Sequence, residues 1–128
     1  MRFGVFLLAA QFPGQDHTVV LESTVAAAVA AEEAGFDDVW VAEHHFMSYG
    51  VCPSAITLAG YLLGATRRVA VGTAVSVLST QHPVALAEQA ALMPPAPGGP
   101  PRTLPRHAGR HGAAHRHRPL HSHGGRRR

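Results

Sequence analysis

The sequence has 128 residues, enough for one modest domain but short of the roughly 250 that a complete eight-unit α/β barrel requires. Residues 1–93 carry all eight acids and three arginines, a net charge of −5, whereas residues 94–128 carry eight arginines and no acid, a net of +8. The lone cysteine excludes an intrachain disulfide, and no apolar run reaches the roughly 18 residues of a membrane-spanning helix. We therefore expect a cytoplasmic protein that does not associate with membranes.

Residues 1–93 alternate between two apolar patterns. Continuous apolar runs predict buried strands at 3–9, 38–42 and 69–75. Helical spacing predicts helices over 17–34 with Asp16 as N-cap and Gly35 as the stop, from Pro53 to about residue 65, and from Pro83 to 93. This βαβαβα order predicts a parallel sheet whose outer strands have open edges.

Residues 94–128 follow neither pattern. Of these 35 residues, 27 are Arg, His, Pro or Gly, and none is aromatic, acidic, Val or Ile. Such a composition cannot build a core, so we expect a disordered tail. Three origins stay open: out-of-frame reading of GC-rich coding DNA, which we favour, a solvated tail of another origin, or a dedicated tail that binds nucleic acid or metal.

Polar residues follow the second predicted strand, as Glu43-His44-His45. Functional groups collect at the carboxyl ends of parallel strands, and an imidazole there can take and return protons while a neighbouring carboxylate orients it. The alternative is that these residues only cap the strand. We expect His44 to be the functional imidazole and His45 less so, because consecutive residues point in opposite directions. His17 and His82 are interpreted as structural, and no metal site is predicted from ligand spacing.

Five segments resemble the amino-terminal part of the bacterial luciferase-like flavin-dependent monooxygenases, especially the luciferase α-type subunit. They are RFGVFLL at 2–8, EEAGFDDVWVAEHHF at 32–46, YLLGAT at 61–66, VGTAV at 71–75 and HPV at 82–84. The resemblance covers residues 1–93 and implies the first three βα units of a TIM (β/α)8 barrel, incomplete, followed by the unrelated tail at 94–128. The inner barrel face would then lack its opposing strands; we assign to it Phe6, Leu8, Val41 and Val71.

The resemblance also implies a site. His44 matches the family's active-site histidine and Glu43 the acidic residue beside it, while Ala74-Val75 matches a segment packed on the flavin ring, where members can have a non-prolyl cis peptide bond. Without the resemblance, Ala74-Val75 would be read as plain strand-end packing. The family's later phosphate-binding strand ends have no counterpart in residues 94–128, so we expect this chain to be truncated and inactive.

The implied reaction combines reduced FMN with oxygen and oxygenates an organic substrate such as an aldehyde. A flavin reductase would supply the reduced FMN, and full-length members can form homo- or heterodimers. One alternative is a deazaflavin-dependent oxidoreductase of the same superfamily. Another is a non-catalytic remnant whose basic tail binds nucleic acid or metal, although we do not expect nucleic acid as a partner.

Overall fold

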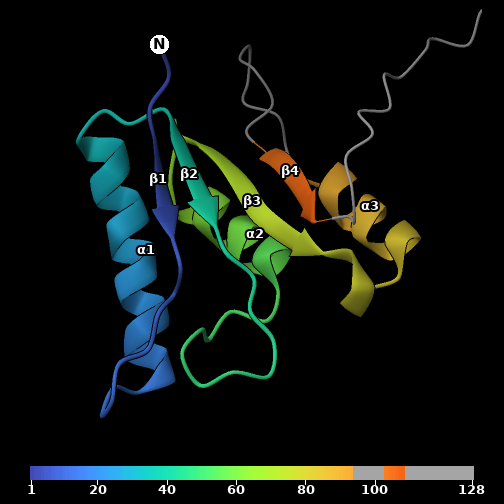
Figure 1. The fold of residues 1–128 in the computed structure, drawn as a ribbon. Coiled ribbons are helices and arrows are strands. Elements are labelled where there is room, and N and C mark those ends of the chain that lie inside the picture. Colours follow the sequence, from blue (N-terminus) through green and yellow to red (C-terminus); the bar gives the residue numbers. More distant parts are fainter. Residues whose placement is uncertain (94–102, 109–128) are drawn as a thin grey trace, which may run out of the picture.

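The computed structural model describes residues 1–93 and 103–108, and three βα units follow one another through the first range (Figure 1). The strands are β1 Gly4–Leu7, β2 Asp38–Val41, β3 Ala70–Val77 and β4 Thr103–Ala108. The helices are α1 His17–Glu33, α2 Ala55–Ala65 and α3 Pro83–Ala91, with a short 3-10 turn, η1 Leu78–Thr80, between β3 and α3. The predicted βαβαβα order is confirmed.

The four strands form one parallel sheet in the order β1-β2-β3-β4. The register places Phe6 beside Trp40 and Trp40 beside Gly72. Because the strands are parallel, the segments that follow β1, β2 and β3 all leave the sheet at the same edge. In Figure 1 the long loop from β2 to α2 hangs below that edge.

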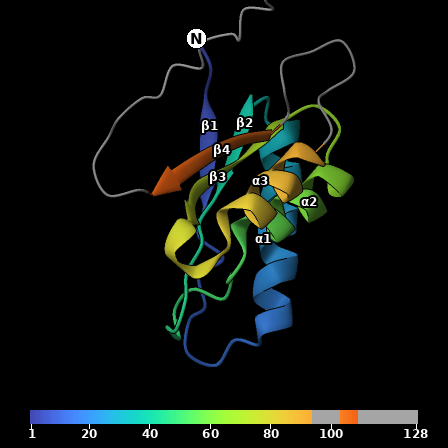
Figure 2. The same cartoon turned by 90° about the vertical axis from the view of Figure 1, so that its right-hand side faces the viewer.

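Helices α1 and α2 lie against one face of the sheet and bury the core there (Figure 2). Val39, Val41 and Val71 are fully buried and share one apolar cluster with Leu58 and Leu62 of α2. The assignment of Val41 and Val71 to the inner barrel face was therefore wrong. Side chains alternate along a strand, so once these valines face the helices, the residues between them face away.

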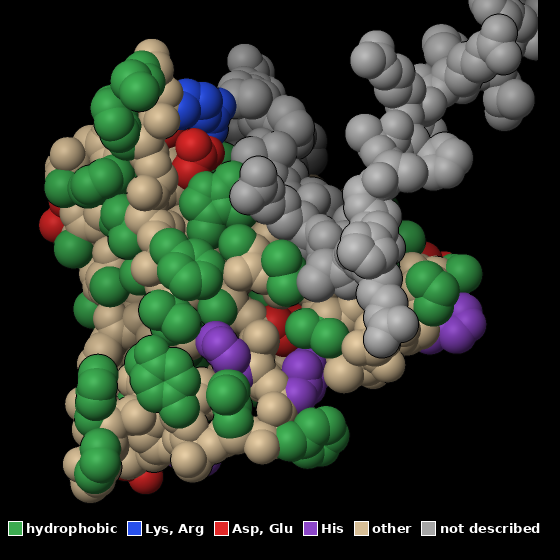
Figure 3. Space-filling view, viewed as in Figure 1, with side chains coloured by type: hydrophobic (Ala, Val, Ile, Leu, Met, Phe, Trp, Pro, Cys, Tyr) green, Lys and Arg blue, Asp and Glu red, His purple; other side chains and the backbone are tan. Residues whose placement is uncertain are grey.

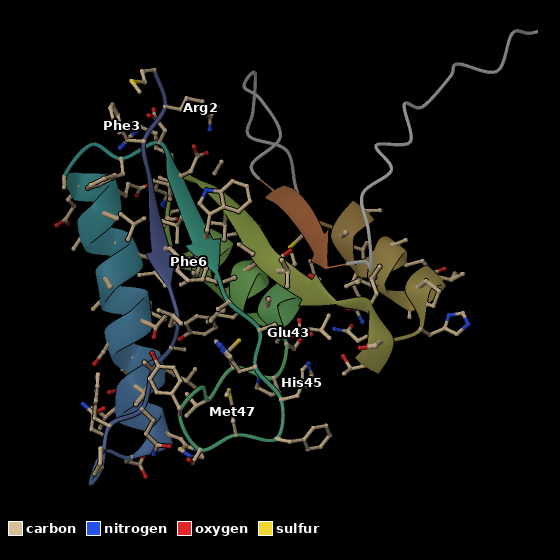
Figure 4. All side chains as sticks on the ribbon, in the orientation of Figure 1. Arg2, Phe3, Phe6, Glu43, His45 and Met47 are labelled. Atoms are coloured by element: carbon tan, nitrogen blue, oxygen red, sulfur yellow. The ribbon has the colours of Figure 1, made fainter. Side chains whose placement is uncertain are left out.

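The opposite face of the sheet carries exposed apolar side chains (Figure 3). Phe6 points to this face, as Figure 4 shows, and it is 50% exposed, while its register partner Trp40 is partly buried. Within the described residues no helix covers this face. β1 is thus not the strand covered on both faces that its continuous apolar run predicted, because only one layer of helices is present.

Two helix starts show how capping sets the boundaries. The Asp16 carboxylate accepts a hydrogen bond from the Thr18 N–H at 2.7 Å, which confirms the predicted N-cap of α1. α2 begins at Ala55 rather than at Pro53, because the Ser54 side chain accepts from the Thr57 N–H and becomes the N-cap. Pro53 therefore lies just outside the helix.

The tail contains one strand that we did not expect. β4 pairs parallel with β3 along its edge. Parallel pairing needs only backbone N–H and C=O groups, which the edge of β3 offers, and an edge strand tolerates a proline such as Pro105. The expectation of disorder otherwise falls on residues 94–102 and 109–128, which lie outside the described residues. Of the helices described, none is both long and apolar enough to cross a membrane.

Candidate active site

The candidate site lies where β2 ends, at the edge of the sheet from which the β2–α2 loop hangs. Figure 4 shows Glu43 and His45 just beyond the end of this strand. Glu43 is 7% exposed, whereas His44 and His45 are half-buried. A buried carboxylate needs strong partners, so its hydrogen bonds indicate what it does.

Glu43 ties together three elements of the fold. Its Oε2 accepts a hydrogen bond from the Ala55 N–H at 3.0 Å, at the first turn of α2. Its Oε1 accepts from the Val77 N–H at 3.1 Å, at the end of β3, and from the Gln81 side chain at 3.4 Å. Donors to an ionised carboxylate stabilise its charge, and the free N–H groups of a helix start add to that. Glu43 therefore fixes the ends of β2 and β3 relative to α2.

His45 is the imidazole that pairs with Glu43. Its Nε2 lies 2.8 Å from Glu43 Oε1 and 3.3 Å from the Thr80 hydroxyl of η1. The expectation that the carboxylate orients the neighbouring His44 was wrong in this respect. Side chains two positions apart lie on the same side of an extended segment, so Glu43 meets His45 instead.

His44 points into its own loop. Its backbone N–H donates to the Cys52 carbonyl at 2.9 Å, and its ring meets the Tyr49 ring edge-on with centroids 6.3 Å apart. Its Nδ1 is buried and has no hydrogen-bond partner in the part of the chain that the structure describes. The loop therefore encloses one side of this imidazole without satisfying that nitrogen.

Ala74 and Val75 lie near the carboxyl end of β3, on the strand beside β2. The peptide bond between them is cis, as the resemblance implied, and both residues are half-buried. The hydrogen bond from Val77 to Glu43 ties this part of β3 to the residues that follow β2. The structure thus brings Glu43 and the Ala74-Val75 segment to one edge of the sheet, with His44 next to Glu43 in the chain.

These residues fit one end of a flavin. Small side chains at residues 72 and 74 of β3 leave room for a flat ring, whereas the unpartnered Nδ1 of His44 is buried in its own loop and does not face that ring. The phosphate end has no counterpart in the described side chains. Arg2, Arg67 and Arg68 precede β1 and β3, and so lie at the opposite edge of the sheet.

Sequence reasoning missed three residues of this site: Gly50, Thr80 and Gln81. Thr80 and Gln81 follow β3 and carry no motif. Gly50 lies in the loop that encloses His44. The sequence shows a glycine between Tyr49 and Val51, but nothing in it indicates contact with His44. His17 is exposed and opens α1, and His82 is exposed before α3. Among the described residues, no three His, Cys, Asp or Glu side chains are grouped so that they could hold a metal ion.

The chain belongs to the luciferase-like monooxygenase family, whose sequence profile it matches over residues 1–99. It is 45% identical over 93 residues to the alkanal monooxygenase alpha chain of Photorhabdus laumondii, covering 73% of this chain and 26% of that one. It is 38% identical over 95 residues to the alkanal monooxygenase beta chain of Photobacterium leiognathi, covering 73% of this chain and 29% of the relative. The chain thus spans about a quarter of the length of these curated relatives.

Solved structures support the same fold. The monooxygenase RslO1 from Streptomyces bottropensis superposes with a TM-score of 0.66 at 30% identity, over 73% of this chain and 29% of that one. The oxygenating constituent of 3,6-diketocamphane monooxygenase from Pseudomonas putida, solved with FMN, gives a TM-score of 0.65 at 22% identity, over 70% and 25% of the two chains. The latter likeness bears on the fold alone. The βα units described here are the opening part of a family barrel.

Proposed function

We propose that residues 1–93 form the part of a flavin-dependent monooxygenase that handles protons beside the flavin ring. The proposed reaction oxygenates an organic substrate, such as an aldehyde, with reduced FMN and oxygen. The observation that carries the proposal is that Glu43, followed by His44, and the small Ala74-Val75 segment lie at one edge of the sheet, joined through the 3.1 Å hydrogen bond from Val77 to Glu43.

Each residue has a separate task in this proposal. Ala74 and Val75 lie against the ring, where bulky side chains would exclude it. His44 takes or returns a proton at the ring or the substrate, and Glu43 holds the strand ends in place through its hydrogen bonds. When bound, the reduced flavin supplies the electrons that activate oxygen. A reductase would deliver that reduced flavin. The relatives include alpha and beta chains, so we also propose that the full-length protein pairs with a second chain of the family.

The activity can be tested in a chimera, because this chain spans about a quarter of its relatives. Residues 1–93 replace the matching part of the Photorhabdus laumondii alpha chain, and oxidation of an alkanal is measured with reduced FMN and oxygen. We expect turnover. A folded, flavin-binding chimera without turnover would contradict the proposal, and hydride transfer without oxygen consumption would favour the deazaflavin alternative.

In that chimera, His44→Ala should lower turnover by about 10²–10⁴-fold, the usual contribution of a general acid–base group. Flavin affinity should change little, because the ring-facing residues are intact. His17→Ala serves as the matched control, since His17 is exposed on α1, away from the strand ends. Turnover of His44→Ala within about threefold of the parent would remove His44 from proton transfer.

A further inference from the structure

We propose that Gly50 is a positioning residue for His44: because Gly50 has no side chain, the side chain of His44 can occupy the space beside its Cα. The inference deepens the proposed function, since it explains what fixes the proposed proton-transfer group. It rests on the close approach of two residues whose backbones are both held in place.

The approach is too close for any side chain at position 50. A Cβ placed on Gly50 would lie 2.5 Å from His44 Cγ and 2.6 Å from both His44 Cβ and Nδ1. Non-bonded carbon atoms sit about 3.5–4.0 Å apart at their optimum. Rotating the imidazole about its own bonds moves Cγ and Nδ1 but leaves His44 Cβ where it is. The clash therefore includes His44 Cβ, so a different rotamer of His44 would not remove it.

Neither backbone is free to retreat. Gly50 forms an antiparallel bridge with Ala10 after β1, in which Gln11 N–H donates to the Tyr49 carbonyl at 2.7 Å and Val51 N–H to the Ala9 carbonyl at 3.2 Å. On the other side, His44 N–H is bonded to the Cys52 carbonyl at 2.9 Å. A side chain at position 50 would have to break one of these contacts.

The glycine is not required by its own backbone conformation. Gly14 and Gly35 have positive φ angles of 85° and 90°, where other residues are strained, but Gly50 is not among the residues with positive φ. Alanine could therefore adopt the backbone of Gly50 if His44 were absent. This difference makes the proposal testable.

The packing also selects one form of the imidazole. A neutral imidazole carries its proton on either Nδ1 or Nε2. A proton on Nδ1 would be a buried donor without an acceptor, which costs free energy. An unprotonated Nδ1 without a partner costs less. The contact with Gly50 therefore favours the proton on Nε2, and Nε2 becomes the atom that exchanges protons.

The test is a double-variant cycle on the 128-residue chain, with urea unfolding followed by fluorescence of the single tryptophan, Trp40. Gly50→Ala should lower the unfolding midpoint clearly when His44 is present and hardly at all in the His44→Gly background. Gly64→Ala is the matched control, because a Cβ on Gly64 meets nothing within 4 Å. An equal loss in both backgrounds would overturn the proposal. If Gly50→Ala alone does not fold, folding of the double variant supports it and failure of the double variant overturns it.

Nitrogen NMR of the His44 ring supplies a readout that a merely structural glycine would not move. The parent chain should show Nδ1 bare and the proton on Nε2 at a pH where the ring is neutral. Gly50→Ala should shift the ring toward a mixture of both forms, and Gly64→Ala should not. An unchanged ring signature in a folded Gly50→Ala chain would overturn the proposal. Neither measurement needs flavin. The Gly50 proposal can therefore be overturned while the chimera is active, and it can be supported while the chimera is inactive.

Discussion

Glu43 shows how one side chain can serve structure while it lies beside the chemistry. Both of its oxygens already accept hydrogen bonds from protein donors, on α2, at the end of β3 and on His45. An acid that exchanges protons with a substrate needs an accessible oxygen, whereas Glu43 is 7% exposed and each of its oxygens already accepts from a protein donor. These hydrogen bonds favour a positioning role for Glu43 and leave the proposed proton transfer to His44.

Glu43→Gln should destabilise the chain by about 1–3 kcal/mol, the cost of leaving a buried donor unsatisfied. The amide keeps one acceptor oxygen, so either the Ala55 N–H or the Val77 N–H loses its partner. Urea unfolding measures the change, and Glu88→Gln on the exposed side of α3 is the control. Equal midpoints for Glu43→Gln and Glu88→Gln would show that the network contributes nothing to stability.

At the scale of elements, α1 is fastened to the loop before β3 by a single carboxylate. Glu32 accepts hydrogen bonds from the backbone N–H groups of Arg67, Arg68 and Val69, and the Arg68 guanidinium donates to the Glu32 carbonyl. Burial alone would raise the pKa of the Glu32 carboxyl. The hydrogen bonds from Val69, Arg68 and Arg67 outweigh it, so the pKa is lowered below the ordinary value of 4.5.

This lowered pKa gives Glu32 a pH-dependent role. The unfolded chain binds the proton more readily than the folded chain, so the stabilisation is fully present above pH 4.5 and is lost as the pH falls through the lower folded pKa. Unfolding midpoints measured between neutral and acidic pH should therefore converge for the parent and Glu32→Gln. The exposed Glu33→Gln is the control and should follow the parent. If the unfolding midpoint of Glu32→Gln stayed below that of the parent by the same amount down to acidic pH, this assignment would be contradicted.

The elements also show what local patterns can and cannot predict. Strand order and the Asp16 cap were predictable, because apolar periodicity and capping act between residues close in sequence. The face on which Val41 and Val71 lie was not, because it depends on which side the helices cover. β4 was missed because its pairing uses the backbone. At the site, the position of Glu43 and His44 at a strand end was predictable, whereas the Glu43–His45 pair depends on the path of the chain after the strand.

At the scale of the whole molecule, helices α1 and α2 cover one face of the sheet (Figure 2), whereas the other face carries apolar side chains (Figure 3) and is covered by no helix of the described residues. β1 pairs only with β2 among the described strands, so its outer edge offers unpaired backbone groups. Exposed apolar patches and free strand edges both favour association with other chains. The chain is therefore expected to self-associate at high concentration.

Phe6→Thr should lower the fraction of chain found in aggregates, because it removes a half-exposed aromatic ring from the sheet face and keeps a residue suited to strands. Sedimentation velocity at rising protein concentration measures that fraction. Val84→Thr on α3 is the control, since Val84 is 58% exposed, comparable to Phe6 at 50%, but lies on a helix. If both variants reduced aggregation equally, the sheet face would not be the surface responsible.

The carbonyl that receives the His44 N–H belongs to Cys52, the single cysteine, which is 3% exposed. Burial raises the pKa of its thiol, and the nearby Glu43 charge raises it further, so the reactive thiolate is scarce while the thiol stays buried. Modification of this sulfur by a maleimide or disulfide reagent should therefore be slow and should require local opening around Cys52. The rate of thiol modification therefore measures how often the contacts between His44 and the segment that ends at Cys52 are broken.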